Sequence, residues 1–124
     1  MKILVVDDET DVQLLFEQRF RREIRDGELA FAFSHSGEEA LLFLKDHFSE
    51  IVLILSDINM PGMSGLELLR KIKATYQHPP TLVMMITAYG DEESHTLAMS
   101  YGADDFLTKP LDFAQLKQKL KSAL

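Results

Sequence analysis

Residues 51–62 read IVLILSDINMPG, and this stretch decides the fold class of the chain. The run over 51–56 is apolar up to its last residue, Asp57 follows directly, and a Pro-Gly pair then marks a turn. A short apolar run without alternation is typical of a parallel strand that is covered on both faces. We therefore predict a buried parallel strand over 51–56, with the Asp57 carboxylate at its carboxyl end.

Four other short runs have the same β character, and they lie at 3–6, 29–33, 82–87 and 106–108. Segments between and after them carry apolar residues at steps of three and four, which indicates amphipathic helices over 12–24, 40–44, 66–72, 97–101 and 113–120. A strand followed by a helix, five times over, predicts an α/β fold. We expect a three-layer α/β/α sandwich around a five-stranded parallel sheet, (βα)5, in one domain over 1–124.

Composition narrows the classes of function. Hydrophobic residues make up 46% and charged residues 27% of the 124 residues, as in a globular domain. No run is long enough to span a membrane and no signal peptide is evident, so we expect a cytoplasmic protein without membrane contact. The net charge of −7 argues against nucleic-acid binding by this domain. The lack of cysteine excludes disulfides and thiolate metal sites.

Charged or hydroxyl residues end four of the five expected strands. Asp7 and Asp8 follow the first strand, Asp57 follows the third, Thr87 ends the fourth and Lys109 follows the fifth. The carboxyl ends of parallel strands meet at one edge of a sheet, where ligands bind in such folds. Each close pair of carboxylates costs roughly 4 kcal/mol at an effective dielectric of 20, so protonation, a cation or the lysine must compensate.

An all-oxygen cluster favours Mg²⁺ over zinc as that cation. A carboxylate beside Mg²⁺ and an ammonium group is prepared to attack phosphorus. Each residue also has an ordinary interpretation by itself: an aspartate caps a helix, a threonine stabilises a strand, and a lysine is solvated. Independent accidents rarely place all of them at the ends of different strands, so we favour a phosphoryl-transfer site.

At these positions the chain resembles the response-regulator receiver family over essentially its whole length. The motifs that match are Val6-Asp7-Asp8-Glu9, Asp57 with Met60-Pro61-Gly62 and Gly65, Thr87-Ala88, Gly102-Ala103-Asp104-Asp105 and Lys109-Pro110. The resemblance implies a flavodoxin-like fold with strand order 2-1-3-4-5. It also implies that Asp57 accepts a phosphoryl group from the phosphohistidine of a histidine kinase or a phosphotransfer protein.

The resemblance further implies a role for each residue at the site. Mg²⁺ would be bound directly by Asp8, Asp57 and the backbone carbonyl of Asn59, and Asp7 would act mainly through water. Lys109 and Thr87 would contact phosphoryl oxygens, and a cis Lys109-Pro110 bond is allowed. Thr87 and Phe106 would form the switch, although Phe106 lacks the hydroxyl of the more usual tyrosine. Asn59 and Tyr89 stand at rate-tuning positions.

The function predicted is that of a signalling module and not of an enzyme, apart from its own phosphorylation and autodephosphorylation. Phosphorylation would reshape the surface of the last two helices and the strand between them, which controls a downstream effector domain or protein. One alternative is a haloacid-dehalogenase-type hydrolase, but that family requires a second aspartate at the position of Asn59. The other alternative is an interaction scaffold that needs no phosphorylation.

Three other groups of charged or titratable residues leave their interpretation open. Opposite charges on the last two helices could join activated chains in a homodimer, or could simply be solvated: Asp91, Glu92 and Glu93 against Lys117, Lys119 and Lys121. Four arginines near the end of the first helix complement its dipole or help to hold a kinase: Arg19, Arg21, Arg22 and Arg25. Four histidines without metal-ligand spacing are expected in exposed or turn positions: His35, His47, His78 and His95.

Overall fold

The computed structural model describes residues 1–76, 82–88 and 90–123. Its five strands form one parallel sheet in the order β2-β1-β3-β4-β5, which confirms the fold class and the strand order. The strands are β1 (Lys2–Val6), β2 (Ala30–Ser34), β3 (Ile51–Asp57), β4 (Leu82–Thr87) and β5 (Asp105–Thr108). Each expected strand agrees with the observed one to within one residue at either end.

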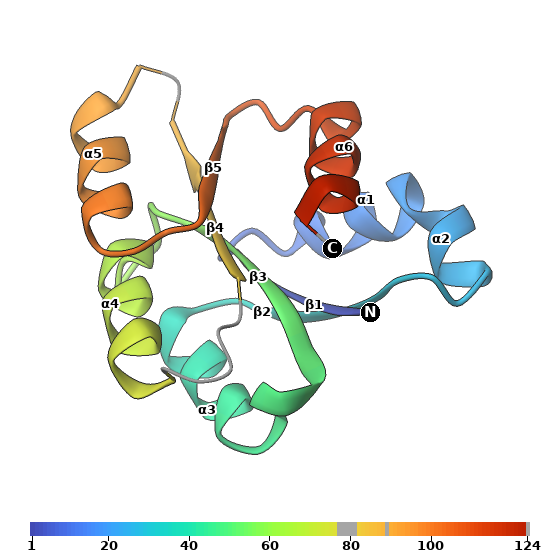
Figure 1. Ribbon diagram of the computed structural model, residues 1–124, viewed down its shortest axis with the longest axis horizontal. Helices are drawn as coiled ribbons and strands as arrows, with labels where there is room; N and C mark the ends of the chain where they lie inside the picture. The colour runs from blue at the N-terminus through green and yellow to red at the C-terminus, as the bar shows by residue number, and fades with distance from the viewer. Residues whose placement is uncertain (77–81, 89, 124) are drawn as a thin grey trace.

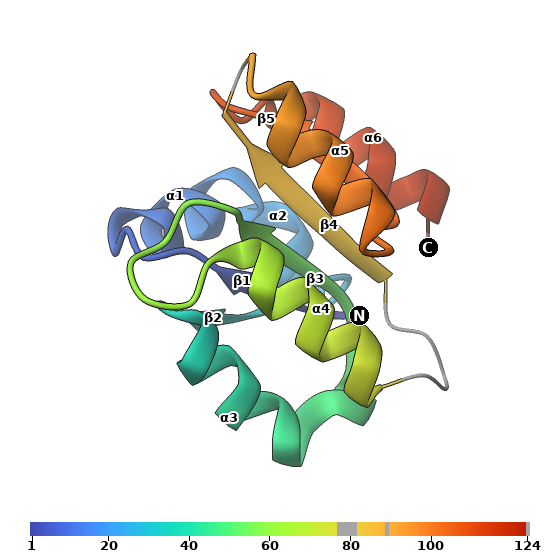
Figure 2. The same ribbon diagram turned by 90° about the vertical axis from the view of Figure 1, so that its left-hand side faces the viewer.

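Helices cover both faces of the sheet, which gives the three layers that we predicted (Figure 1). They are α1 (Asp11–Arg19), α2 (Arg21–Arg25), α3 (Gly37–His47), the 3-10 turn η1 (Phe48–Glu50), α4 (Gly65–Thr75), α5 (Glu92–Ser100) and α6 (Phe113–Ala123). One face carries α3, α4 and α5, and the other carries α1, α2 and α6 (Figures 1 and 2).

The core is divided by the sheet into two clusters. Leu4 and Val6 of β1 point to the side of α3, α4 and α5, whereas Ile3 and Val5 point to α1 and α6. All four side chains are buried. Because successive residues of a strand alternate between faces, an unbroken apolar run is what two covered faces require.

The first predicted helix is in fact two helices, and this expectation was wrong. Helix α1 ends at Arg19 and α2 starts at Arg21, because Phe20 leaves the helical region with φ −109° and ψ 21°. Phe20 is fully buried and its ring lies 5.8 Å from that of Phe16. The turn at Phe20 keeps this ring in the core, and Ile24 of the expected apolar stripe is left 37% exposed.

Within the residues that the structure describes, no helix combines the length and the apolar character needed to cross a membrane.

Candidate functional site

The sheet register brings the predicted site residues to one edge. Val6 pairs with Ser56, so that Asp7, directly after β1, and Asp57, the last residue of β3, lie side by side. On the other side of β3, Asp57 pairs with Ile86, directly before Thr87. The residues thus lie at the carboxyl end of neighbouring strands, as the sequence predicted.

Three carboxylates converge at this edge. One oxygen each from Asp7, Asp8 and Asp57 lies within 4.8 Å of the others. Asp7 and Asp57 are 6% and 2% exposed, and Asp8 is more open to solvent. Three oxygen donors of this kind fit a hard divalent cation, because their mutual repulsion is relieved when a positive charge lies between them.

Backbone amides hold two of these carboxylates in place. The N–H of Glu9 donates to Asp7 Oδ1 at 2.9 Å, and the N–H of Asn59 donates to Asp57 Oδ1 at 3.2 Å. Burial raises the pKa of the Asp7 carboxyl, the bond from Glu9 opposes that rise, and the negative charge of Asp57 adds to it. Asp7 is therefore destabilised as an anion in this site.

Lys109 supplies the positive charge at the site. Its Nζ donates to Asp57 Oδ2 at 2.6 Å, from the loop that follows β5. Partial burial lowers the pKa of Lys109, but the hydrogen bond and charge of Asp57 outweigh it, so that the net pKa is raised. The lysine stays an ammonium group that can neutralise a second anion at Asp57. The Lys109-Pro110 peptide bond is cis.

Thr87 and Phe106 lie on β4 and β5, the two strands beyond β3 in the sheet. Thr87 is buried at the end of β4, and its Oγ1 donates to the carbonyl of Leu107 at 3.4 Å. Phe106 is half-buried, and its ring centroid lies 3.6 Å from that of His95 on α5. The threonine hydroxyl therefore connects β4 to the strand that carries the aromatic ring.

Gly65 lets α4 begin against the end of β3. Its N–H donates to the carbonyl of Ile58 at 2.8 Å, and a Cβ at this position would overlap the carbonyl oxygen of Asp57. Ser64 caps the same helix by accepting from the N–H of Glu67 at 3.2 Å. Only glycine permits this close approach, which fixes the backbone that carries Asp57.

The histidine expectation was wrong for His95, which is half-buried within α5, whereas His35 lies in the bend between β2 and α3, a turn position as expected. His95 is half-buried against Phe106, and His35 is half-buried with its Nδ1 3.1 Å from the carbonyl oxygen of Asp7. His35 directly follows β2, the neighbour of β1, so the rule that found the acids could have found it too. His47 pairs with Glu50, at 2.6 Å. His78 lies outside the described residues, and so does Tyr89.

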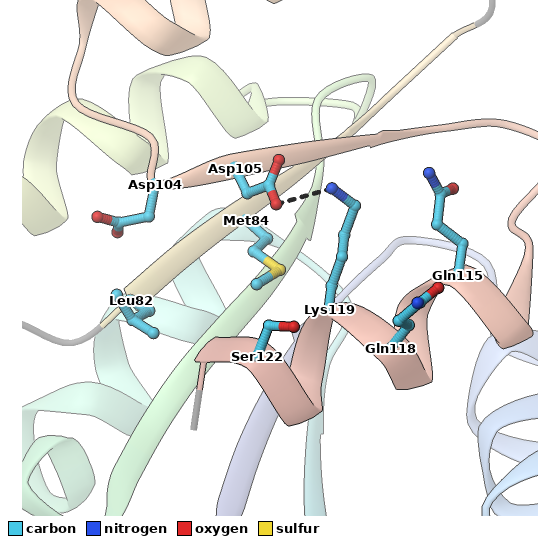
Figure 3. Close-up of a pocket in the computed structure, with 8 residues that line it drawn as sticks. All are labelled: Leu82, Met84, Asp104, Asp105, Gln115, Gln118, Lys119 and Ser122. Carbon is cyan, nitrogen blue, oxygen red and sulfur yellow. Dashed lines mark hydrogen bonds and ion pairs between the residues drawn. The ribbon is translucent and has the colours of Figure 1, made fainter.

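A hollow of about 600 Å³ lies apart from the acidic site, between β4, β5 and α6. Asp105 and Lys119 point toward each other across it and form an ion pair of 2.8 Å (Figure 3). Gln115, Gln118 and Ser122 of α6 also line it. Of the predicted site residues that the structure describes, none lines this hollow.

Together, a doubly wound parallel sheet and an acidic cluster with one lysine at its carboxyl edge define a class of α/β signalling domains. The model of the response regulator receiver domain family matches residues 3–121. The chain therefore belongs to the response regulator receiver domain family, and its function is that of a receiver domain in two-component signalling.

The curated relatives that the chain matches are longer than the chain. The chain is 34% identical over 122 residues to the response regulator RppA of Synechocystis sp., with 98% of this chain and 50% of RppA covered. It is 34% identical over 123 residues to the transcriptional regulatory protein CpxR of Escherichia coli, with 99% and 49% covered. The chain spans about half the length of these relatives.

Solved structures agree with the family. A response regulator receiver domain protein from Clostridium thermocellum has a TM-score of 0.85 and 29% identity, with 98% of this chain and 92% of that chain covered. The receiver domain of NtrX from Brucella abortus has a TM-score of 0.81 and 33% identity, with 98% and 97% covered.

Proposed function

We propose that Asp57 accepts a phosphoryl group from the phosphohistidine of a histidine kinase or phosphotransfer protein. The observation that carries this proposal is the Lys109–Asp57 contact of 2.6 Å, with Asp57 2% exposed beside two more acids. A structural ion pair alone would not need Asp7 and Asp8 beside it. Family membership supports the same role.

In the proposed step an oxygen of Asp57 attacks phosphorus, the P–N bond to the donor histidine breaks, and the imidazole leaves with the electron pair of that bond. The product is an acyl phosphate on Asp57. Lys109 then neutralises an oxygen of the phosphoryl group, and the Thr87 hydroxyl turns from the Leu107 carbonyl to donate to another.

The acidic cluster fits Mg²⁺ because three carboxylate oxygens within 4.8 Å face a single lysine and leave an excess of negative charge. We propose that Asp8, Asp57 and the Asn59 carbonyl would hold the cation, with Asp7 acting mainly through water. When bound there, Mg²⁺ would supply positive charge to the oxygens of the transferring phosphoryl group.

Phosphorylation would switch the surface of α5, β5 and α6. Movement of Thr87 toward the new anion vacates space behind β4, into which the Phe106 ring can rotate. In the structure that ring packs on His95, so rotation would also release α5. We propose that this surface controls a downstream effector domain or protein.

A hydrolase is the less favoured alternative. A haloacid-dehalogenase-type enzyme needs a second aspartate two residues after the nucleophile, and Asn59 stands there. We propose instead that Asn59 and Tyr89 only tune the lifetime of the phosphorylated state. The side chain of Asn59 is exposed beside Asp57, where it can influence the approach of water.

Fewer charged side chains are available to form the proposed homodimer of activated chains than the sequence suggested. Lys119 is paired with Asp105 and Lys117 with Glu23, at 2.8 and 3.3 Å within one chain. A dimer through α5, β5 and α6 would have to break or share these pairs. Nucleic acid is not a proposed partner of this domain, given its net charge of −7.

The test of the phosphoacceptor is intact-mass measurement after treatment with acetyl phosphate and Mg²⁺. Wild type should gain one phosphoryl group and Asp57→Asn none, while Asp26→Asn, at an exposed acid on another part of the surface, should behave as wild type. Uptake by Asp57→Asn at the wild-type rate would refute the assignment. Turnover of small phosphomonoesters by wild type would favour the hydrolase.

The switch is tested by amide NMR spectra with and without beryllofluoride. Shifts should extend from the site to Thr87, Phe106 and His95 in wild type. In Phe106→Ala the shifts at the site should persist while those on α5 shrink. Equal α5 shifts in both proteins would show that the ring does not transmit the signal.

A further inference from the structure

We propose that a basic hollow at the opposite end of the molecule from the acids binds an acidic segment of a protein partner. The hollow has a volume of about 440 Å³ and lies between the end of α1, α2 and α6. Five of the chain's 13 lysines and arginines line it: Arg19, Arg21, Arg22, Arg25 and Lys117. Such a concentration of positive charge stands out in a chain of net charge −7.

Part of this positive charge is not paired closely with a carboxylate, although Arg25 pairs with Asp26, Lys117 pairs with Glu23, and Arg22 acts on Glu23 through its charge. Among the residues that the structure describes, no carboxylate lies within 4.0 Å of the guanidinium groups of Arg19, Arg21 or Arg22. Arg19 instead stacks over the ring of Phe113, at 5.5 Å. Crowded cations repel one another, and a bound anion would relieve that repulsion.

The helix dipole does not account for the cluster. Cations are favoured in the last turn of a helix, and Arg19, Arg22 and Arg25 occupy such positions. Arg21, however, is the first residue of α2, where a cation is disfavoured. The cluster therefore includes charge beyond what helix stability can use.

Burial does not explain α2 either. None of the five residues of α2 is buried, and Ile24 is 37% exposed. The helix is nonetheless held in place, because the carbonyl of Glu23 accepts the N–H groups of Glu28 and Leu29 at 2.9 and 3.2 Å. Helix α2 thus has a fixed place after α1 (Figure 1), and its arginines line the hollow together with Arg19 of α1 and Lys117 of α6.

An apolar cavity adjoins the basic hollow and indicates what kind of anion would bind. The cavity measures about 140 Å³. Its apolar lining consists of Met1, Phe20, Leu29 and Leu120, and charged residues border it: Glu23, Glu28, Lys117 and Lys121. Glu23 and Lys117, an ion pair of 3.3 Å, line both spaces. A dry cavity of about 150 Å³ is large enough to admit benzene, so this one accepts a single large apolar side chain.

An acidic peptide with one apolar anchor residue matches both spaces. A long polyanion such as DNA would extend past the hollow and meet the acidic remainder of the chain. A short segment senses mainly the charges within a screening length of about 8 Å. The charged residues that line the two spaces are Arg19, Arg21, Arg22, Arg25, Lys117 and Lys121 against Glu23 and Glu28, so the segment would meet a net positive surface. The apolar cavity gives such a segment a fixed register that a uniform polyanion would not use.

The test uses the full chain and a short blocked peptide in which one leucine is flanked on both sides by glutamates, followed by amide NMR. Shifts should be confined to α2, the residues after it and the end of α6, and should weaken at higher salt. Arg21→Glu with Arg22→Glu should weaken binding about tenfold or more. Lys45→Glu with Lys71→Glu, a control that changes the net charge equally, should leave binding nearly unchanged.

Further probes test the choice of partner. Replacing the leucine of the peptide by serine should weaken binding several-fold, and wild-type affinity would overturn the role of the apolar cavity. Equal weakening in the control double variant, or no shifts at millimolar peptide, would overturn the site. Tighter binding of single-stranded DNA or of anionic vesicles at the same amides would overturn the peptide assignment. Beryllofluoride binding should be unchanged in both double variants.

Discussion

At the carboxyl end of the sheet, Asp7 and Asp57 are buried beside one lysine, whereas the amino end carries exposed arginines, of which Arg19 and Arg21 have no carboxylate within 4.0 Å among the described residues. Charges buried in this way are costly and hold a fixed geometry, which suits a chemical step. Exposed charges cost little and act over a distance, which suits encounter with a partner. The two ends therefore use opposite charge for different purposes.

The pKa values of two carboxylates show a contrast between the two ends: that of Asp7 is raised and that of Glu23 is lowered. Burial raises the pKa of Asp7, and neighbouring Asp57 adds to the rise. At the amino end burial also acts to raise the pKa of Glu23, but its backbone hydrogen bond and Lys117 outweigh burial and lower it. The surroundings of Asp7 thus destabilise its ionised form, whereas those of Glu23 stabilise its ionised form.

Two glycines give the largest expected contrast. A Cβ at Gly65 would overlap the Asp57 carbonyl oxygen and lie 2.7 Å from the Cα of Ile58, both backbone atoms that cannot move aside. Gly65→Ala should lower the free energy of unfolding by roughly 3 kcal/mol and disturb phosphoryl uptake. Gly27 at the amino end has open space around it and φ +75°, so Gly27→Ala should cost only about 1 kcal/mol.

Urea unfolding of both variants measures this difference, and intact mass after acetyl phosphate treatment measures uptake. Gly27→Ala should take up phosphate like wild type. Equal losses of stability in the two variants would mean that the close approach at Gly65 does not constrain the Asp57 backbone.

Two lysines give the next contrast. Lys109→Ala leaves Asp57 buried without a cation and should cost about 1–2 kcal/mol, less than for a fully buried pair because the lysine is 39% exposed. It should also stop beryllofluoride-induced NMR shifts from reaching Phe106. Lys119→Ala breaks the pair with Asp105 but should cost less than about 1 kcal/mol. Wild-type-like shifts at Phe106 in Lys109→Ala would contradict the role of the ammonium group.

The fold and the acidic edge could be predicted from sequence because they follow from unbroken apolar runs, from helical steps of three and four, and from the residues at strand ends. Strand β4 (Leu82–Thr87) matches the predicted run, since both of its faces are buried and the apolar run has clear ends. Asp7, Asp57 and Lys109 were predicted to meet because parallel strands share an edge. Their contact distances needed the structure.

Other features depend on packing that no local pattern encodes. The break at Phe20 arises because its ring packs in the core against Phe31 of β2 and the edge-to-face ring of Phe113 of α6, which lie outside the helix. His95 of α5 and Phe106 of β5 are in contact although they belong to different elements, so the local sequence around either residue does not predict the contact. The basic hollow likewise combines Lys117 of α6 with arginines from the first quarter of the chain.

The smallest expected effects are changes in the free energy of unfolding that have opposite signs at the two ends of the molecule. Asp7 has a pKa above its ordinary value of 3.8, so the folded state holds its proton more tightly than the unfolded state and ionisation of Asp7 opposes folding. Asp7→Asn should therefore stabilise the chain at neutral pH, and this gain should shrink as pH falls through the raised pKa toward 3.8. Glu23 has a pKa below 4.5, so its ionisation favours folding above that pH.

Glu23→Gln should accordingly destabilise the chain at neutral pH, and the loss should fade only as pH falls below 4.5 through the lowered pKa. Urea unfolding of wild type and both variants over an acidic series gives the two differences directly, and subtraction from wild type cancels the titration of groups that do not interact with the replaced residue. Asp46→Asn, at an exposed acid on α3, serves as a control for the loss of one negative charge. If Asp7→Asn destabilised at neutral pH as Glu23→Gln does, the Asp7 anion would be stabilised where it lies, and the contrast between a strained end and a relaxed end would be wrong.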